Sequence, residues 1–133
     1  DPARFGVRFE YDAGLAHRIE AGCDMILMPS RFEPCGLTQM YSMRYGAIPI
    51  VRATGGLADT VEHFDVRGKR GTGFVFEHAD TRGLMWAVDE ALAAYAKPGP
   101  WTVLMRNAMT RDFSWSLSAE RYEAVYLHAQ YNV

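Results

Sequence analysis

The sequence predicts an α/β protein built on a parallel, Rossmann-like sheet with flanking helices. Two observations support this fold class. Through residues 6–97, short apolar or alternating runs take turns with segments of helical spacing, which is the order of a parallel sheet with right-handed crossovers. Glycine or proline follows several of these segments, where helices and strands commonly end. The length of 133 residues suits one domain with its own core.

Four strands are expected in chain order. Residues 6–11 alternate between apolar and polar side chains, as a half-buried strand does. Residues 24–29 form an apolar run, which is typical of a parallel strand covered on both faces. Residues 47–51 form the third strand, in which Pro49 limits pairing on one side. Residues 73–77 form the fourth.

Six helices are expected between and after these strands. The segment at 36–45 repeats apolar side chains at helical spacing and ends at Gly46. The Pro-Gly-Pro sequence at 98–100 predicts a break before the last two helices. In order, the helices are expected at residues 13–22, 36–45, 57–63, 81–97, 101–111 and 117–130.

The segment at 81–97 has the clearest helical pattern. A stripe of apolar side chains at helical spacing is the face that a surface helix buries. The stripe expected to face the core consists of Leu84, Met85, Val88, Leu92 and Tyr95.

Composition narrows the functional classes. The formal net charge is −2 and the pI is about 6.1, so neither a nucleic-acid surface nor an anionic membrane surface is indicated. No apolar run approaches the roughly 18 residues of a membrane span. Cys23 and Cys35 form neither a disulfide framework nor a zinc spacing. Reduced thiols in a cytoplasm-like compartment, and no metal, are therefore expected.

The predicted topology places four loops at one edge of the sheet. Ligands of parallel α/β sheets bind beyond the carboxyl ends of the strands. The Gly55–Gly56 pair at this edge lacks the Lys-Ser/Thr of a P-loop, so it is interpreted as a tight turn. The segments expected at the edge are residues 11–12, 30–36, 52–56 and 77–78.

The loop PSRFEPCGLTQM, residues 29–40, carries the main indication of a binding site. A helix that begins at Gly36 presents free amides at a partly positive end, which suits a diphosphate. The expected donors are the amides of Gly36, Leu37 and Thr38, with the Thr38 hydroxyl. The pattern alone leaves open an ordinary helix N-terminus that is capped by its own side chain.

Three other side chains have both a binding and a structural interpretation. Glu33 could accept hydrogen bonds from sugar hydroxyls or could complement the helix dipole. Cys35 has no histidine nearby in sequence and is interpreted as a packed small residue rather than a nucleophile. Tyr11, at a predicted strand end, could stack on a base or could belong to the core.

The chain closely resembles the bacterial glycogen synthase and plant starch synthase family in the segment SRFEPCGLTQMYSMRYGAIPIVRATGGLADTV, residues 30–61. The segments EYDAGLAHRIEAGCDMILMPS, TGFVFEHAD and DFSWSLSAERYEAVY continue the likeness over nearly all of the chain. The resemblance implies a retaining glucosyltransferase of the GT-B fold. Such an enzyme transfers glucose from ADP-glucose to the non-reducing end of an α-1,4-glucan without a metal or cofactor. A cytoplasmic location in bacteria, or a plastid in plants, is implied as well.

The resemblance also implies that residues 1–133 are a single partial domain, with C-terminal helices at about 101–131. The chain begins without a methionine and is similar to the later part of the second GT-B domain. In the family, the first domain and the arginine and lysine that neutralise the departing diphosphate precede this part. The isolated chain is therefore expected to be inactive.

The same interpretation predicts surfaces without their usual cover. Two outcomes are open for the strand at 24–29. Either the strand at 6–11 docks directly beside it, which a right-handed crossover through the helix at 13–22 permits, or the strand at 6–11 stays unpaired and 24–29 presents a bare edge, which is a recognised route to association. The last helix should expose its apolar side chains, so self-association or marginal stability is expected. The side chains concerned are Tyr122, Val125, Tyr126 and Leu127.

Carried over by position, the resemblance assigns roles at the donor site. Glu33 corresponds to the acidic residue that holds the donor glucose and supports the charged transition state. The diphosphate and glucose contacts correspond to the amides of Cys35, Gly36 and Leu37, with Thr38.

Two aromatic residues correspond to nucleotide contacts. Tyr11 corresponds to the aromatic that stacks on adenine, and Tyr41 lies where related GT-B enzymes carry a ribose-binding glutamate. Glu10 stands where a small residue is usual, which leaves the preference for ADP or UDP open. Two alternatives remain: a non-catalytic module that binds a nucleotide or sugar phosphate, and another nucleotide-sugar glycosyltransferase, similar to sucrose synthase.

Overall fold

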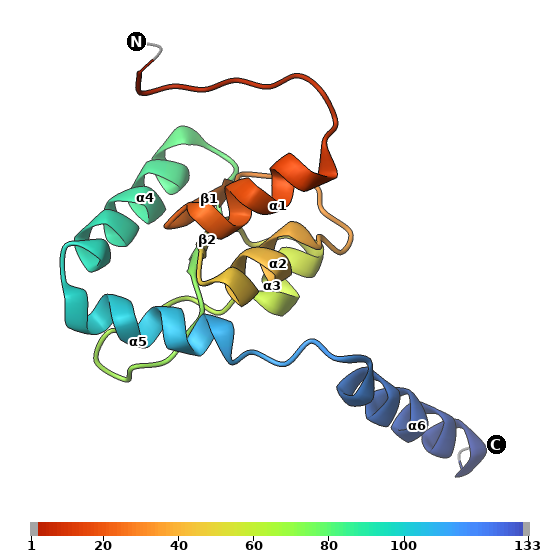
Figure 1. The fold of residues 1–133 in the computed structure, drawn as a ribbon. Coiled ribbons are helices and arrows are strands. Elements are labelled where there is room, and N and C mark those ends of the chain that lie inside the picture. The colour runs from red at the N-terminus through yellow and green to blue at the C-terminus, as the bar shows by residue number, and fades with distance from the viewer. Residues whose placement is uncertain (1–2, 132–133) are drawn as a thin grey trace.

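The computed structural model describes residues 3–131, which contain six helices and three strands (Figure 1). The strands are β1 (Met25–Met28), β2 (Ile48–Arg52) and β3 (Phe74–Phe76). The helices are α1 (Ala13–Gly22), α2 (Thr38–Tyr45), α3 (Gly55–Thr60), α4 (Thr81–Tyr95), α5 (Pro98–Met109) and α6 (Trp115–Tyr131).

The three strands form one parallel sheet in the order β1-β2-β3. In this register Met25 pairs with Ile48, and Ile50 pairs with Phe74. Helix α2 connects β1 to β2, and α3 lies on the connection from β2 to β3. The predicted α/β class with a parallel sheet is therefore confirmed.

Pro49 lies in the central strand and still leaves both pairings intact. The amide of Ile48 donates to the carbonyl of Asp24 (2.9 Å), so position 48 faces β1. Successive residues of a strand face opposite neighbours, which turns position 49 toward β3. Pairing with β3 begins one residue later, at Ile50. The N–H that proline lacks is thus not needed for this ladder.

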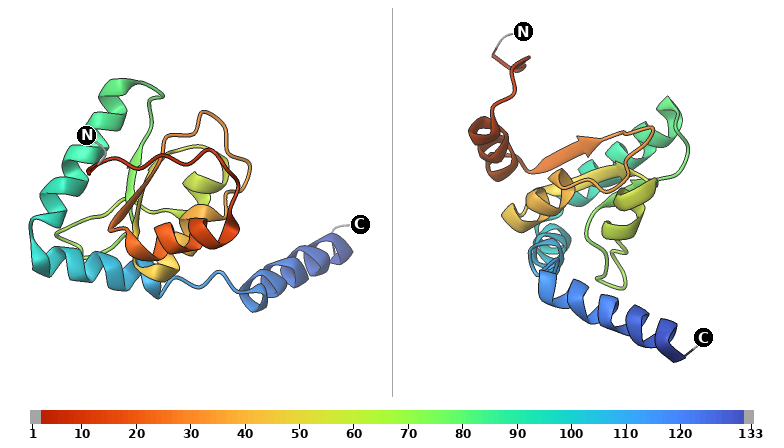
Figure 2. Two further views of the ribbon diagram at one scale, coloured as in Figure 1. Left: turned by 45° about the horizontal axis from the view of Figure 1, so that its top comes forward. Right: turned by 90° about the vertical axis from the view of Figure 1, so that its right-hand side faces the viewer.

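Helices cover both faces of the sheet and one of its ends. α2 and α3 lie on one face and α4 lies on the other (Figures 1 and 2), and α1 packs against α2. α5 packs against α2 and α4. From α5, Asn107 donates to the carbonyls of Lys69 and Gly71 just before β3. α5 therefore closes the amino ends of the strands, and the carboxyl ends stay open.

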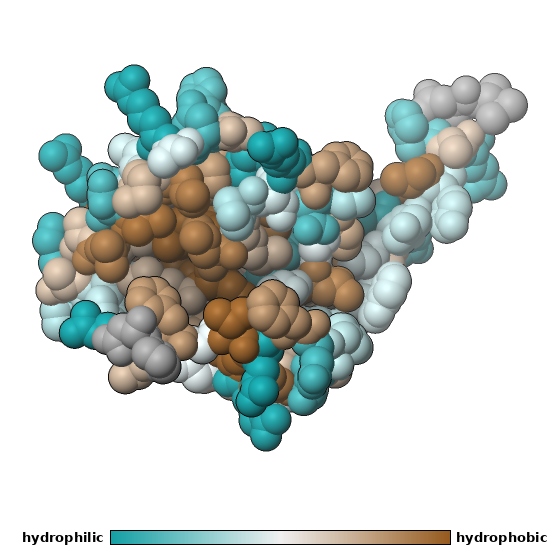
Figure 3. Space-filling model, turned by 90° about the horizontal axis from the view of Figure 1, so that it is seen from above, coloured by the Kyte–Doolittle hydropathy of each residue, from teal (hydrophilic) through white to brown (hydrophobic). Residues whose placement is uncertain are grey.

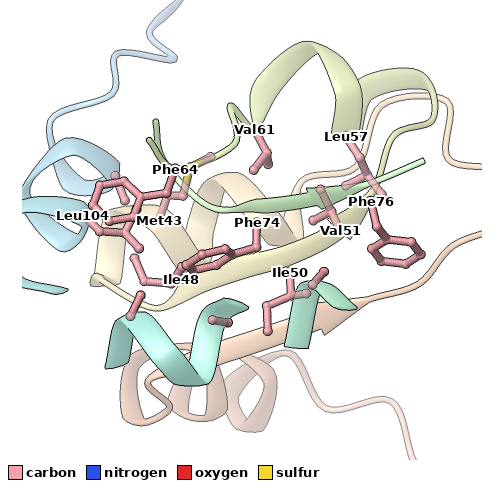
Figure 4. Close-up of a cluster of buried hydrophobic side chains, with 14 of the residues drawn as sticks. Met43, Ile48, Ile50, Val51, Leu57, Val61, Phe64, Phe74, Phe76 and Leu104 are labelled. Carbon is pink, nitrogen blue, oxygen red and sulfur yellow. The ribbon is translucent and has the colours of Figure 1, made fainter. Parts of the chain in front are cut away.

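The core lies around β2 and β3, between the two helical layers (Figure 4). The first four residues of β2 are buried. Deleting a large side chain from such a core costs about 2–5 kcal/mol. The largest fully buried hydrophobic side chains are Phe74, Met43, Ile48, Leu57, Leu104 and Val51.

Helix α4 packs through alanines rather than through the predicted stripe. Its buried residues are Ala87, Ala91 and Ala94, whose small side chains let the helix approach the sheet closely. Leu84 and Val88 of the stripe are partly buried, but the other three side chains are 45–52% exposed. Figure 3 shows a broad apolar area on the face seen from above. The exposed members of the stripe are Met85, Leu92 and Tyr95.

The strand predicted at residues 6–11 is wrong, because this segment is extended but unpaired and exposed. A strand needs a neighbour to satisfy its backbone, and no described segment supplies one. β1 is consequently an edge strand. Leu27 is 48% exposed and the other three residues of β1 are only partly buried. The expected cover on both faces of this strand is therefore wrong. Of the two outcomes left open for residues 6–11, the structure shows the one in which they stay unpaired and β1 has a bare edge.

Helix boundaries differ from the predictions where glycine or proline decides them. α2 begins at Thr38 rather than at 36, because Gly36 takes a left-handed φ of 70°. α5 begins at Pro98, since proline suits the first turn of a helix. α3 spans Gly55–Thr60 rather than 57–63. Gly46 ends α2 with a φ of 87°, as predicted.

Helix α6 projects away from the body of the chain (Figure 2). No residue of this helix is buried, so the predicted lack of cover is confirmed. Within residues 3–131, no helix is long and apolar enough to cross a membrane. The four side chains named above are 48–70% exposed: Tyr122, Val125, Tyr126 and Leu127.

Candidate functional site

The loop that follows β1, residues 29–37, lies at the open carboxyl edge of the sheet, as predicted. Its first residues are held by Arg52 at the end of β2. The Nε of Arg52 donates to the carbonyl of Ser30 (2.8 Å), and Nη2 donates to the carbonyl of Arg31. The loop is thus fixed to the neighbouring strand where it leaves β1.

The middle of the loop is held by the glycine turn at the start of α3. The amide of Gly56 donates to the carbonyls of Glu33 (3.1 Å) and Pro34 (3.2 Å). An ideal Cβ on Gly55 would lie 2.0 Å from the Glu33 carbonyl oxygen, and one on Gly56 would lie 1.8 Å from that of Cys35. Only glycine permits this contact, so the pair is more than the tight turn predicted from the sequence.

The end of the loop is held by Gln39, a fully buried residue in the first turn of α2. Its Nε2 donates to the carbonyls of Cys35 (3.1 Å) and Gly36 (2.8 Å). The same nitrogen lies 3.1 Å from Oγ1 of Thr60 on α3, so its two N–H groups are shared among three acceptors. The Thr60 hydroxyl in turn donates to the carbonyl of Gly56 (2.5 Å).

These inward carbonyls determine where the loop amides point. In a trans peptide the N–H is directed opposite to the C=O, and residues 3–131 contain no cis peptide. The carbonyls of Pro34, Cys35 and Gly36 accept from the body of the domain. The three amides that follow them, on Cys35, Gly36 and Leu37, therefore point to the open side.

The outward amides have a geometry that suits an anion. Gly36 is left-handed and Leu37 is right-handed (φ −109°, ψ −30°), the alternation that turns successive N–H groups into one concavity. Within the described chain, the amides of Cys35, Gly36 and Leu37 have no partner. The Thr38 amide that begins α2 adds the positive end of a helix.

Two side chains stand beside these amides with their polar atoms available. The Glu33 carboxylate is half-buried and has no ion pair or hydrogen bond within residues 3–131. The Thr38 hydroxyl is likewise unpaired in the described chain. The Cys35 thiol is exposed and lies 3.7 Å from the carbonyl of Gly36. It is not the packed small residue predicted from the sequence.

The two tyrosines assigned to the nucleotide differ in their surroundings. Tyr41 on α2 is 44% exposed, and its ring meets the His17 ring edge to face, with the two centroids 5.6 Å apart. With Cys35 and Leu37, it lines a broad groove of about 1480 Å³. Tyr11 is 97% exposed in the segment before α1, where the predicted strand is absent. Its adenine contact stays a prediction.

A second hollow lies at the same edge, after β3. Its volume is about 630 Å³, and Glu77, His78 and Trp86 line it. Trp86 stacks on the ring of His63, with centroids 5.4 Å apart. The predicted position of residues 77–78 at this edge is confirmed. Within the described residues, no cluster of three or more metal-ligating side chains occurs.

Three residues that hold the loop were not predicted from the sequence to do so: Arg52, Gly56 and Gln39. The signal for Gly56 was the paired glycines after β2, at the edge where ligands bind. The signal for Gln39 was a polar residue on the helical face that also carries Met43. Neither signal identifies a partner without the fold.

An open Rossmann-like sheet with outward amides at its carboxyl edge is the architecture of a nucleotide- or phosphate-binding domain. Residues 10–101 match the family model described as glycosyl transferases group 1. The chain belongs to this glycosyltransferase family.

Several proteins that are similar to this chain are named glycogen synthases. The chain is 54% identical over 129 residues to a glycogen synthase from Koribacter versatilis, covering 97% of this chain and 27% of the relative. It is 50% identical over 132 residues to a glycogen synthase from Fervidobacterium nodosum, covering 99% and 27%. The expected likeness to glycogen synthases is therefore confirmed, and the chain spans about a quarter of these relatives.

A solved structure confirms the fold. The catalytic domain of starch synthase IV from Arabidopsis thaliana, bound to ADP and acarbose, superposes with a TM-score of 0.78. The two chains are 45% identical, and the match covers 90% of this chain and 25% of that one. The chain thus has the fold of part of the GT-B C-terminal domain.

Proposed function

We propose that the complete protein is a retaining glucosyltransferase that transfers glucose from ADP-glucose to the non-reducing end of an α-1,4-glucan. In this proposal the described chain contributes the donor side of the active site. A first GT-B domain contributes the acceptor side and the cations that complete the site. A cytoplasmic location, or a plastid in a plant, belongs to the same proposal.

The observation that carries this proposal is one loop with two chemical functions. The outward amides of Cys35, Gly36 and Leu37 suit the diphosphate, and the free carboxylate of Glu33 lies two residues before the first of them. In a nucleotide sugar the sugar ring is bonded directly to the diphosphate. A carboxylate next to a group of amides therefore suits the sugar and the diphosphate respectively. The names of the relatives, and the ADP and acarbose bound to the Arabidopsis structure, support the same donor and acceptor classes.

The chemistry requires both functions at the same time. Breaking the glucosyl–phosphate bond develops negative charge on the diphosphate and positive charge on the sugar. Preorganised amides stabilise the first charge, and a carboxylate beside the ring stabilises the second. Glu33 therefore acts in the transition state, whereas the amides act on donor binding as well. Tyr41 and Tyr11 are assigned to the nucleoside, and Thr38 to the donor phosphate or glucose.

The test compares two variants of the complete protein in a radiolabel assay with ADP-glucose and glycogen. Glu33→Ala should lower kcat about 100-fold or more, with ADP affinity and melting temperature nearly unchanged. Glu90→Ala, at an exposed position on α4, is the matched control and should keep wild-type turnover. The new linkages should have the α configuration by NMR.

The outcomes separate the candidate functions. Wild-type turnover by Glu33→Ala would remove this residue from the active site. A wild-type protein that binds ADP but transfers no glucose would indicate a non-catalytic binding module. Faster transfer from UDP-glucose than from ADP-glucose would refute the donor assignment.

A further inference from the structure

Gln39 is fully buried near the start of α2, yet its side chain is only partly satisfied. Burying an amide costs free energy unless its donors and acceptors are paired. Nε2 has three acceptors, but Oε1 has no partner within residues 3–131. An apolar side chain of similar length would fill the space without an unpaired oxygen. Packing alone therefore does not account for an amide at this position.

Thr60 determines which way the Gln39 amide faces. The Thr60 hydroxyl gives its single proton to the carbonyl of Gly56 (2.5 Å). It can then only accept from Gln39, which requires Nε2 on that side (3.1 Å). The opposite orientation would set Oε1 against the carbonyls of Cys35 and Gly36. α3 thus fixes the donor direction of a side chain on α2.

Gly36 is fitted to the same side chain. An ideal Cβ at this position would lie 2.5 Å from Oε1 of Gln39 and 3.0 Å from Nε2. The Gln39 amide therefore fills the space directly beneath Gly36. The left-handed backbone of Gly36 and the buried amide beneath it form one unit, which faces the open edge through its N–H groups.

We propose that Gln39 is a positioning residue of the donor diphosphate site. It holds the carbonyls of Cys35 and Gly36 inward, and thereby directs the amides of Gly36 and Leu37 outward, toward the phosphates. Thr60 acts through Gln39 by setting its orientation. This inference rests on the proposed donor site.

The test measures affinities of the complete protein for ADP and for adenosine, which lacks the phosphates. Gln39→Met keeps the length of the side chain but removes the donor. It should weaken ADP binding about tenfold or more, since it releases two loop carbonyls. Adenosine binding should change less than twofold, because the nucleoside does not use these amides. Glu90→Met, which places a methionine at an exposed position on α4, is the control.

A second variant covers the case in which Gln39→Met fails to fold. Thr60→Val should weaken ADP in the same direction by a smaller factor. Where both variants fold, the double variant should bind ADP no more weakly than Gln39→Met alone, because Thr60 acts through Gln39.

The outcomes distinguish this inference from the proposed function. Equal losses for ADP and adenosine, or unchanged ADP affinity in Gln39→Met, would overturn the positioning role alone. If Gln39→Met does not fold, unchanged ADP affinity in Thr60→Val would overturn it. A wild-type protein that binds no ADP would overturn the proposed donor site, and this inference with it.

Discussion

Gly56→Ala tests the contact that holds the loop at residues 29–37 against α3. This loop is called the donor loop after its proposed role. The added Cβ would lie 1.8 Å from the carbonyl oxygen of Cys35 and 2.5 Å from its Cα. Real Cβ atoms essentially never approach closer than 3.0 Å. Both neighbours are backbone atoms, so no side chain can rotate away. The loop must therefore withdraw by more than about 1 Å.

The size of this displacement determines the expected effect. A shift of about 1 Å in a catalytic group can cost on the order of 100-fold in rate. Gly56→Ala should thus lower kcat/KM of the complete protein for ADP-glucose about 100-fold. Overpacking should reduce the free energy of unfolding by about 1–3 kcal/mol. Steady-state kinetics and thermal melting measure the two effects separately.

A matched control isolates the contact from the change of residue type. Gly22→Ala places its Cβ where no heavy atom lies within 4 Å, and it should leave both kcat/KM and stability nearly unchanged. If Gly56→Ala kept more than half of the wild-type kcat/KM, the seating of the loop on α3 would not matter for the donor site. Catalysis would then not depend on the position of the loop.

Two further predictions concern the isolated chain and the pH dependence of stability. The isolated chain should transfer no glucose, and light scattering should show that it self-associates through the bare edge of β1. Leu27→Lys should reduce this association. An active, monodisperse monomer would contradict both expectations. The pKa of Asp65 is lowered, first by the backbone N–H of Gly68 and further by that of Arg67 and by Arg70. The ionised carboxylate therefore stabilises the fold above its unfolded pKa, and this contribution is lost as the pH falls through the lower folded pKa. Asp65→Asn should flatten the acid limb of a stability–pH curve, and an unchanged limb would argue against this role.

The sequence pattern was sufficient for segments whose period and end signals lie within the segment itself. The helix at 13–22 agrees with its prediction, and Asp12 caps it by accepting from the amide of Leu15 (2.9 Å). The three observed strands also lie within their predicted runs, or extend them by one residue at the end of β2. Hydrophobic period and end signals both act over a few residues, so a sequence contains them directly.

The sequence pattern gave wrong or incomplete predictions where a structure depends on contacts with residues far away in the chain. Residues 6–11 alternate as a strand does, but no described strand is available to pair with them. On α4, alanines and larger apolar residues both repeat at helical spacing, and only the closeness of the sheet selects Ala87 and Ala91 for burial. The donor loop was predicted, whereas its anchors were not. The contact between Gly56 and Cys35 exists only after α3 has folded against the loop.

The anchors of the donor loop all come from the segment that directly follows it. The side chains that hold residues 30–36 are at most 22 positions away, on Arg52 and Gln39. Closing such short loops costs little chain entropy, and contacts at short sequence separation form quickly. Residues 29–60 therefore form one continuous segment that contains both the loop and the residues that hold it. Because the same segment also contains β2, the central strand, a substitution in it can disturb the loop and the core of the sheet together.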